Sequence, residues 1–192
     1  MIDAFPESPR KKFTAHDTVR TAMMTSLIAV CSWISIPSAV PFTLQTFAVF
    51  CSILLIGGQR SLLAITAYLL AGAVGVPVFA GFTGGISRLF DSTGGYMIGF
   101  IFTALIYWAS EKLPVRNTAI SVSAMLIGLA AMYFSGTVWF ILIYTGESGA
   151  ITITKALKWC VIPFIIPDLI KLSLSFMITK RLRKHITMHR IN

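Results

Sequence analysis

Long apolar segments, separated by short polar, proline-rich or glycine-rich breaks, set the pattern of this chain. Six segments follow one another, at residues 18–36, 43–56, 61–74, 93–110, 120–144 and 162–179. A helix needs about 20 predominantly apolar residues to cross a bilayer, and the longer segments reach that length. The pattern therefore predicts an all-α membrane protein with six transmembrane helices.

Composition favours the same class. Hydrophobic residues make up 56% of the chain and charged residues 12%, whereas soluble domains carry roughly 25% charged residues. The first apolar segment is as long as a span, so we expect no cleavable signal peptide. The cysteines lie in apolar segments without a C-x-x-C spacing, which predicts buried thiols rather than disulfides or metal ligands.

The flanks divide the chain into three parts. We expect residues 1–17 to be a polar tail or a surface helix, residues 18–183 a six-helix transmembrane domain, and residues 184–192 a basic tail. Asp17 or Thr18 is a candidate N-cap of the first span.

The formal net charge of +9 is unevenly distributed. Lysine and arginine gather in the two tails and in the turns at 57–60 and 111–117, whereas the opposite side holds Arg88 and the interfacial pair Lys155 and Lys158. By the positive-inside rule, both termini face the cytoplasm. The charge then reflects orientation and attraction to anionic lipid rather than nucleic-acid binding.

Seven of the fourteen glycines lie between residues 75 and 99, which this orientation places on the outer side with the proline-rich break at 37–41. Glycine lets backbone turn at positive φ and approach a neighbour closely. Non-helical backbone persists in a membrane protein where protein buries it or a watery cavity wets it. We predict a re-entrant or cavity-lining loop over a ligand pocket. The alternative is an external loop followed by a small-residue helix-packing face.

Asp168 and Lys171 are ionisable residues inside the last apolar segment. At a spacing of i, i+3 they share one helix face and can pair. Ionisable groups at membrane depth are costly and usually mark a functional site. The carboxylate can accept N–H donors of a ligand, and the ammonium can donate to a carbonyl or carboxylate. The alternative is a structural ion pair that holds helices together.

Other candidate residues come from the outer side. Arg88 and Asp91 are either ligand contacts or a solvated loop pair. Thr43 and Gln45 follow the proline-rich break and are either hydrogen-bonding groups for a small polar ligand or part of a helix cap. Aromatic residues suited to the walls of an apolar slot are Phe79, Phe82, Tyr96 and Trp139.

Familiar catalytic motifs are missing from the sequence. It lacks the G-x-x-x-x-G-K-[ST] phosphate loop, the H-E-x-x-H pair and the nucleophile elbow. We therefore expect no catalytic residue, no bound metal, no cofactor and no ATPase activity in this chain itself.

Three motifs occur in order: IPSAVPFTLQTFAV, GAVGVPVFAGFTGGISRLFDSTGGYMIGF and PFIIPDLIKLSL. Together they resemble the BioY family, the biotin-specific substrate-binding (S) components of energy-coupling factor (ECF) transporters. The likeness covers about residues 18–180. It implies high-affinity binding and uptake of biotin in the plasma membrane of a prokaryote. It also implies a transmembrane coupling (T) component and two ABC-type ATPases as partners.

The resemblance implies ligand contacts at matching positions, and Arg88 is added as a partner for the ligand's carboxylate. The matching positions are Thr43, Gln45, Phe79, Gly84, Gly85, Tyr96, Asp168 and Lys171. Small residues of the first segment resemble the family's docking surface for the T component; they are Ala22, Ser26 and Ala29. One departure is that Asp91 and Ser92 stand where family members often have Gly-Pro. Two alternatives stay open: an S component for a different water-soluble vitamin, and a membrane enzyme or structural assembly subunit.

Overall fold

The computed structural model describes residues 14–36, 42–115, 117–148 and 152–188. The expected polar tail up to residue 13, the proline-rich break at 37–41 and the turn residue Arg116 lie outside the described residues, as do the end of the basic tail and the centre of the turn before α6.

The described chain is mainly helical, which confirms the predicted fold class at this level. Its elements are α1 (Ala15–Trp33), β1 (Ser35–Ile36), β2 (Phe42–Thr43), α2 (Gln45–Ile56), α3 (Gly58–Ala73), the 3-10 helix η1 (Ile86–Leu89), α4 (Gly94–Ser110), α5 (Thr118–Ser148), α6 (Ile153–Cys160) and α7 (Ile162–Met188).

Two stretches of the described chain are long and apolar enough to cross a membrane by length and composition. They are Thr118–Thr145, within α5, and Ile153–Arg183, which joins α6 to α7. The helices α2 and α4 are apolar but shorter. At 1.5 Å per residue, the 12 residues of α2 span only about 18 Å, so this helix is shorter than a bilayer core of about 30 Å.

Local sequence explains where the helices begin and end. Thr14, and neither Asp17 nor Thr18, caps α1: Asp17 instead completes a capping box with Thr14. Gly57 separates α2 from α3 with a φ of 84°, so the turn expected at 57–60 is shorter than predicted. Although proline has no backbone N–H to donate, α7 continues through Pro167.

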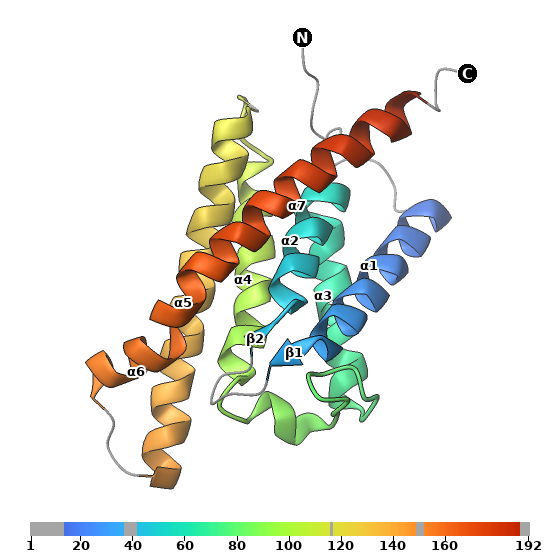
Figure 1. Cartoon of the computed structure of the whole chain (residues 1–192). Coiled ribbons are helices and arrows are strands. Elements are labelled where there is room, and N and C mark those ends of the chain that lie inside the picture. Colours follow the sequence, from blue (N-terminus) through green and yellow to red (C-terminus); the bar gives the residue numbers. More distant parts are fainter. Residues whose placement is uncertain (1–13, 37–41, 116, 149–151, 189–192) are drawn as a thin grey trace.

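The helices form a bundle with two distinct ends (Figure 1). The beginning of α1 and the end of α7 lie at one end, together with the α2–α3 and α4–α5 connections. The β1–β2 hairpin and the segment between α3 and α4 lie at the other end. The hairpin pairs Ser35 with Thr43 and Ile36 with Phe42. This arrangement gathers the β1–β2 pair and the glycine-rich segment at one end of the bundle.

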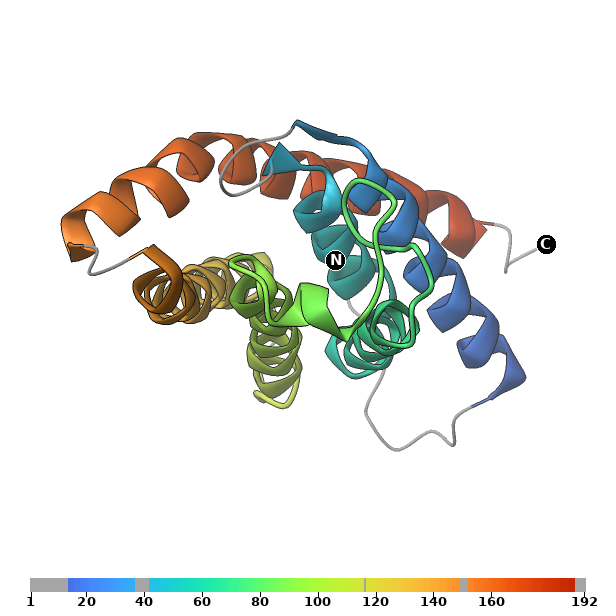
Figure 2. The ribbon, with the colours of Figure 1, turned by 90° about the horizontal axis from the view of Figure 1, so that it is seen from below.

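The helix pair α4–α5 forms one wall of the bundle. Its helices approach closely because glycines face each contact: a Cβ added at Gly95 would lie 2.2 Å from Trp139 Cβ, and one at Gly136 would lie 2.3 Å from the Tyr96 ring. Seen from the hairpin end, α7 lies across from this pair (Figure 2). Among the described residues, α5 packs mainly on α4 and is linked to α7 chiefly through α6.

The end of α1 holds the glycine-rich segment in place. Trp33 Nε1 donates to the carbonyl of Pro77 at 2.9 Å, and Ser32 Oγ donates to the carbonyl of Val78. The Trp33 ring also stacks on Phe82, with the ring centroids 4.8 Å apart. In Figure 2 the segment lies over α3 and the end of α1. It is thereby fixed above the bundle interior.

Candidate functional site

A cavity of about 270 Å³ lies near the hairpin end of the bundle. Its lining comes from β2, α2, the glycine-rich segment, α4, α5, α6 and α7. Pockets for small molecules range from about 300 to 1,000 Å³, so this cavity is close to the lower end. Among the residues predicted from sequence, Thr43, Gln45, Phe79, Arg88, Tyr96, Asp168 and Lys171 line it.

Asp168 and Lys171 form an ion pair deep in the cavity wall. Lys171 Nζ lies 2.9 Å from Asp168 Oδ1, and the two residues are only 6% and 2% exposed. The pair has the i, i+3 spacing on α7 that the sequence indicated. Burying two charges costs several kcal/mol per ion unless geometry and further hydrogen bonds compensate. The surrounding contacts supply those hydrogen bonds.

Strand β2 and the start of α2 supply acceptors for the ammonium group. Lys171 Nζ donates to the carbonyl of Thr43 at 2.7 Å and to Thr46 Oγ1 at 3.0 Å, in addition to Asp168. An ammonium has three N–H donors, so protein acceptors use all of them. The Phe42 ring lies 4.1 Å from Nζ and adds a cation–π contact. Because α2 is short, its first residues can meet this ammonium inside the bundle.

Two hydroxyl groups complete the carboxylate's environment, and sequence reasoning singled out neither. Thr46 Oγ1 donates to Asp168 Oδ1 at 3.0 Å, and Tyr133 Oη donates to Asp168 Oδ2 at 2.7 Å. Both residues also line the cavity. Thr46 lies one residue after Gln45 in the first motif, IPSAVPFTLQTFAV, and that position could have marked it as a cavity residue, although not its bond to Asp168. Tyr133 lies in an apolar run without such a signal.

Gln45 and Phe79 form a further part of the cavity lining. Gln45 is 7% exposed, and its Nε2 donates to Tyr68 Oη at 3.0 Å. The Phe79 ring meets Tyr68 edge-on, with centroids 5.5 Å apart. It lies against Gly72, where a Cβ would come within 2.0 Å of the ring. Thr43 Oγ1 also accepts from the backbone N–H of Gln45, so Thr43 both supports the start of α2 and lines the cavity.

Arg88 and Asp91 stand where the glycine-rich segment borders the cavity. Their side chains are 47% and 44% exposed, and Arg88 Nη1 lies 3.1 Å from Asp91 Oδ2. An exposed pair of this kind contributes about 0–1 kcal/mol to stability. The Asp91 carbonyl accepts a hydrogen bond from Trp139 Nε1 at 3.0 Å, which ties this part of the segment to α5. The Arg88 guanidinium is therefore available at the rim of the cavity, with an acidic neighbour.

Gly84 and Gly85 stand apart from the cavity lining. The N–H of Gly85 donates to the carbonyl of Gly72 at 2.7 Å. A Cβ at Gly84 would lie 2.4 Å from the carbonyl oxygen of Val76. These glycines therefore allow the segment to fold tightly on itself and on the end of α3. The segment as a whole combines both sequence interpretations, since it lines the cavity and then supplies the α4 glycines that pack on α5.

The expected docking face on α1 is divided in the structure. Ala22 and Ser26 are exposed, whereas Ala29 is 7% exposed and belongs to the buried core. Ser26 Oγ donates to the carbonyl of Ala22 at 3.0 Å, which turns its hydroxyl back to its own helix. The exposed small-residue surface therefore includes Ala22 and Ser26 but excludes Ala29.

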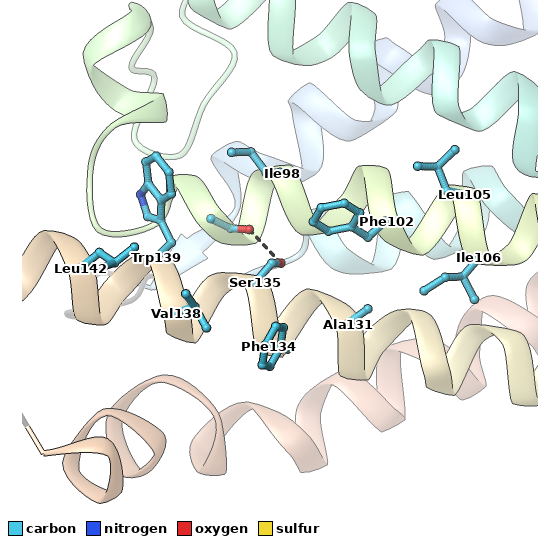
Figure 3. Close-up of a pocket in the computed structure, with 11 residues that line it drawn as sticks. Ile98, Phe102, Leu105, Ile106, Ala131, Phe134, Ser135, Val138, Trp139 and Leu142 are labelled. Atoms are coloured by element: carbon cyan, nitrogen blue, oxygen red, sulfur yellow. Dashed lines mark hydrogen bonds between the residues drawn. The ribbon is translucent and has the colours of Figure 1, made fainter.

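A larger hollow lies between α4 and α5 (Figure 3). This groove has a volume of about 580 Å³ and is lined by apolar side chains such as Phe102, Phe134 and Val138. Ser135 Oγ donates to the carbonyl of Gly95 at 3.2 Å, the bond dashed in Figure 3. Its polar atom is thus engaged by backbone. The groove presents a surface suited to lipid chains rather than to a polar ligand.

Within the described residues, no three His, Cys, Asp or Glu side chains are grouped so as to hold a metal ion. Cys31, Cys51 and Cys160 are buried free thiols, as the sequence predicted. The site is therefore built from one ion pair, hydroxyl and amide groups, and aromatic walls.

The bundle and its buried polar cluster define a class of helical protein whose apolar helices enclose a ligand-sized cavity. Comparison with known proteins specifies that class: the model of the BioY family matches residues 8–188. The chain belongs to the BioY family.

Individual relatives agree. The chain is 39% identical to the biotin transporter BioY of Thermotoga maritima over 86% of this chain and 95% of the relative. It is 33% identical to a probable biotin transporter BioY of Pyrococcus horikoshii over 88% of this chain and 97% of the relative. A crystal structure of the S-component for biotin from an ECF-type ABC transporter matches with a TM-score of 0.75 and 28% identity, over 90% and 95% of the two chains.

Proposed function

We propose that this protein binds biotin with high affinity and takes it up as the substrate-capture (S) subunit of an ATP-driven ECF transporter. The observation that carries the proposal is the buried Asp168–Lys171 pair lining a ligand-sized cavity in a member of the BioY family. Names of relatives point to the same ligand. Charged groups at such depth are expensive and usually serve a ligand or ion pathway.

The chemistry of biotin suits the cavity. Its ureido ring offers two N–H donors, for which the Asp168 carboxylate and the hydroxyl oxygens around it are acceptors. The aromatic walls, including Phe79, Tyr96 and Phe100, suit the bicyclic ring and the alkyl chain. Arg88 at the rim suits a carboxylate. In this proposal Thr43 and Gln45 add hydrogen bonds, and Gly84 and Gly85 keep the segment folded.

Titration of biotin into detergent-purified protein tests the proposal. We expect a dissociation constant well below micromolar, because preorganised polar groups in a dry cavity favour tight binding. Thiamine, riboflavin and folate serve as competitors, and none should displace biotin. A dissociation constant no better than micromolar would contradict biotin capture. Displacement by one of the competitors would instead favour an S component for another vitamin.

We also propose six spans, α1 to α5 and α7, with both termini in the cytoplasm. Arg20, Arg60 and Lys112 belong to helix ends and turns at the end where α1 begins and α7 finishes, and cytoplasmic loops are enriched in such residues. Membrane-impermeant thiol labelling of Ser87→Cys and Ser110→Cys, in protein lacking its native cysteines, tests this orientation in intact cells. We expect labelling of Ser87→Cys and protection of Ser110→Cys. The opposite result would show that the termini face the outside.

The partners proposed are a T component and two ABC-type ATPases, which would supply the ATP hydrolysis. The exposed small residues Ala22 and Ser26 on α1 suit close approach of another helix. Ala22→Leu should therefore reduce co-purification with a T component while leaving biotin affinity unchanged. If Ala22→Leu and the wild type recover the T component equally, this face of α1 is not part of the docking surface.

A further inference from the structure

The Asp168–Lys171 cluster uses its hydrogen-bonding groups unequally. Lys171 donates all three N–H groups to Thr43, Thr46 and Asp168. Asp168 Oδ1 accepts from both Lys171 and Thr46, whereas Oδ2 accepts from Tyr133. A carboxylate has about four acceptor sites, so its remaining capacity lies on Oδ2, beside the phenol. The side of the cluster open to a further donor is therefore the Tyr133 side.

Tyr133 is also the connection between two parts of the bundle. It belongs to α5, which packs along α4 and meets α7 chiefly through α6. Its bond to Asp168, at 2.7 Å, reaches directly from α5 to α7 across the cavity. A second bridge runs from Tyr96 Oη on α4 to the carbonyl of Cys160 at the end of α6, at 3.2 Å. The phenol at 133 thus sets the spacing of the cavity walls at the charged cluster.

We propose that Tyr133 is a positioning residue of the binding site, whose hydroxyl orients Asp168 Oδ2 toward the ligand and holds α5 against α7. This inference rests on the proposed function, since it concerns the same cavity. A hydrogen bond to a charged group is stronger than a neutral one. Removing the phenol oxygen leaves Asp168 held through Oδ1 alone, by Lys171 and Thr46, and removes the direct hydrogen bond from α5 to α7.

The test is a double-mutant cycle on biotin affinity. Tyr133→Phe should weaken binding about tenfold, with a faster dissociation rate and a nearly unchanged association rate. The same substitution in an Asp168→Asn background should change affinity less than about twofold, because the carboxylate through which the phenol acts is gone. Tyr144→Phe, on the same helix with its ring packed near Phe140 and Trp159, is the matched control and should bind like the wild type.

The outcomes separate this inference from the proposed function. No biotin binding by the wild type overturns the function itself. Wild-type binding with an unchanged Tyr133→Phe, or with effects that simply add in the double variant, overturns the role of Tyr133. If Tyr133→Phe fails to fold, the double variant decides: recovery of folding supports action through the buried carboxylate, and continued failure overturns it.

Discussion

The two hollows of this molecule share a wall and differ in almost every other respect. The α4–α5 pair turns Tyr96, Phe100 and Tyr133 toward the polar cavity and turns Phe102 and Phe134 toward the apolar groove. The groove is the larger, at about 580 Å³ against about 270 Å³. Yet polar groups from separate helices converge only in the smaller one of this pair, and convergence of polar groups in an enclosed space characterises a ligand site.

The difference follows from how each hollow treats its polar atoms. In the groove, Ser135 satisfies the backbone of the neighbouring helix and leaves an apolar surface. In the cavity, the ion pair and its hydroxyl partners are buried together and directed at one another. The larger volume of the groove therefore does not make it the ligand site. The free-energy cost of burying charged and polar groups in the smaller cavity is what indicates a function there. Four predictions test this contrast.

The largest effect is expected at the ion pair. Lys171→Ala removes the cation and leaves the Asp168 carboxylate buried without it, a change that typically costs 3–5 kcal/mol when one partner of a buried pair is lost. We expect biotin affinity to fall at least tenfold, about 1.4 kcal/mol, by isothermal titration. Asp168→Asn should also weaken biotin binding at least tenfold. Full affinity in both variants would make the pair purely structural.

A methyl group at the shared wall should affect stability and binding differently according to its position. Gly136→Ala places a Cβ 2.3 Å from the Tyr96 ring, which lines the cavity, whereas Gly128→Ala places one 2.7 Å from Thr103 Cγ2, away from it. Overpacking typically costs 1–3 kcal/mol. Both variants should melt at lower temperature in detergent, but only Gly136→Ala should also weaken biotin binding several-fold. Equal biotin affinity in the two variants would show that overpacking beside Tyr96 does not change the shape of the cavity.

A smaller effect is expected at Gln45. Replacement by Ala removes the donor to Tyr68 Oη, a residue fully buried in the core, and one hydrogen bond is worth about 0.5–1.5 kcal/mol. We expect biotin affinity about fivefold weaker in a fluorescence titration. Tyr68→Phe is the control, because it breaks the same bond and leaves the amide in the cavity. If Tyr68→Phe weakens binding as much as Gln45→Ala does, then Gln45 acts by supporting the wall.

Sequence reasoning succeeded where the information is local. The helical class, the positions of the apolar segments and the i, i+3 pairing of Asp168 with Lys171 each depend on neighbouring residues. It also placed Gln45 and Phe79 at the cavity through motifs. The predicted helix starts were less accurate, since Thr14 rather than Asp17 caps α1.

The rest depended on contacts between distant parts of the chain. Tyr133 and Asp168 are 35 positions apart, and Thr46 and Asp168 are 122 apart. A tyrosine or threonine in an apolar run looks the same whether it faces a carboxylate or lipid. Ala29 likewise continues the small-residue spacing of α1, but tertiary packing buries it. Burial and long-range pairing are properties of the assembled bundle, so no local pattern could supply them.

The smallest effect is expected on the groove side of α4. Phe100 and Phe102 are two residues apart, which places their side chains on nearly opposite faces of a helix with 3.6 residues per turn. Phe100 is 3% exposed and lines the cavity, whereas Phe102 is 42% exposed and lines the groove. Phe102→Ala should leave biotin affinity within about twofold, since exposed positions usually change energies by less than about 0.5 kcal/mol. Phe100→Ala, the same chemical change on the other face, should weaken binding clearly because it removes part of the cavity wall. Loss of affinity in Phe102→Ala equal to that in Phe100→Ala would mean that the groove, too, contributes to ligand capture.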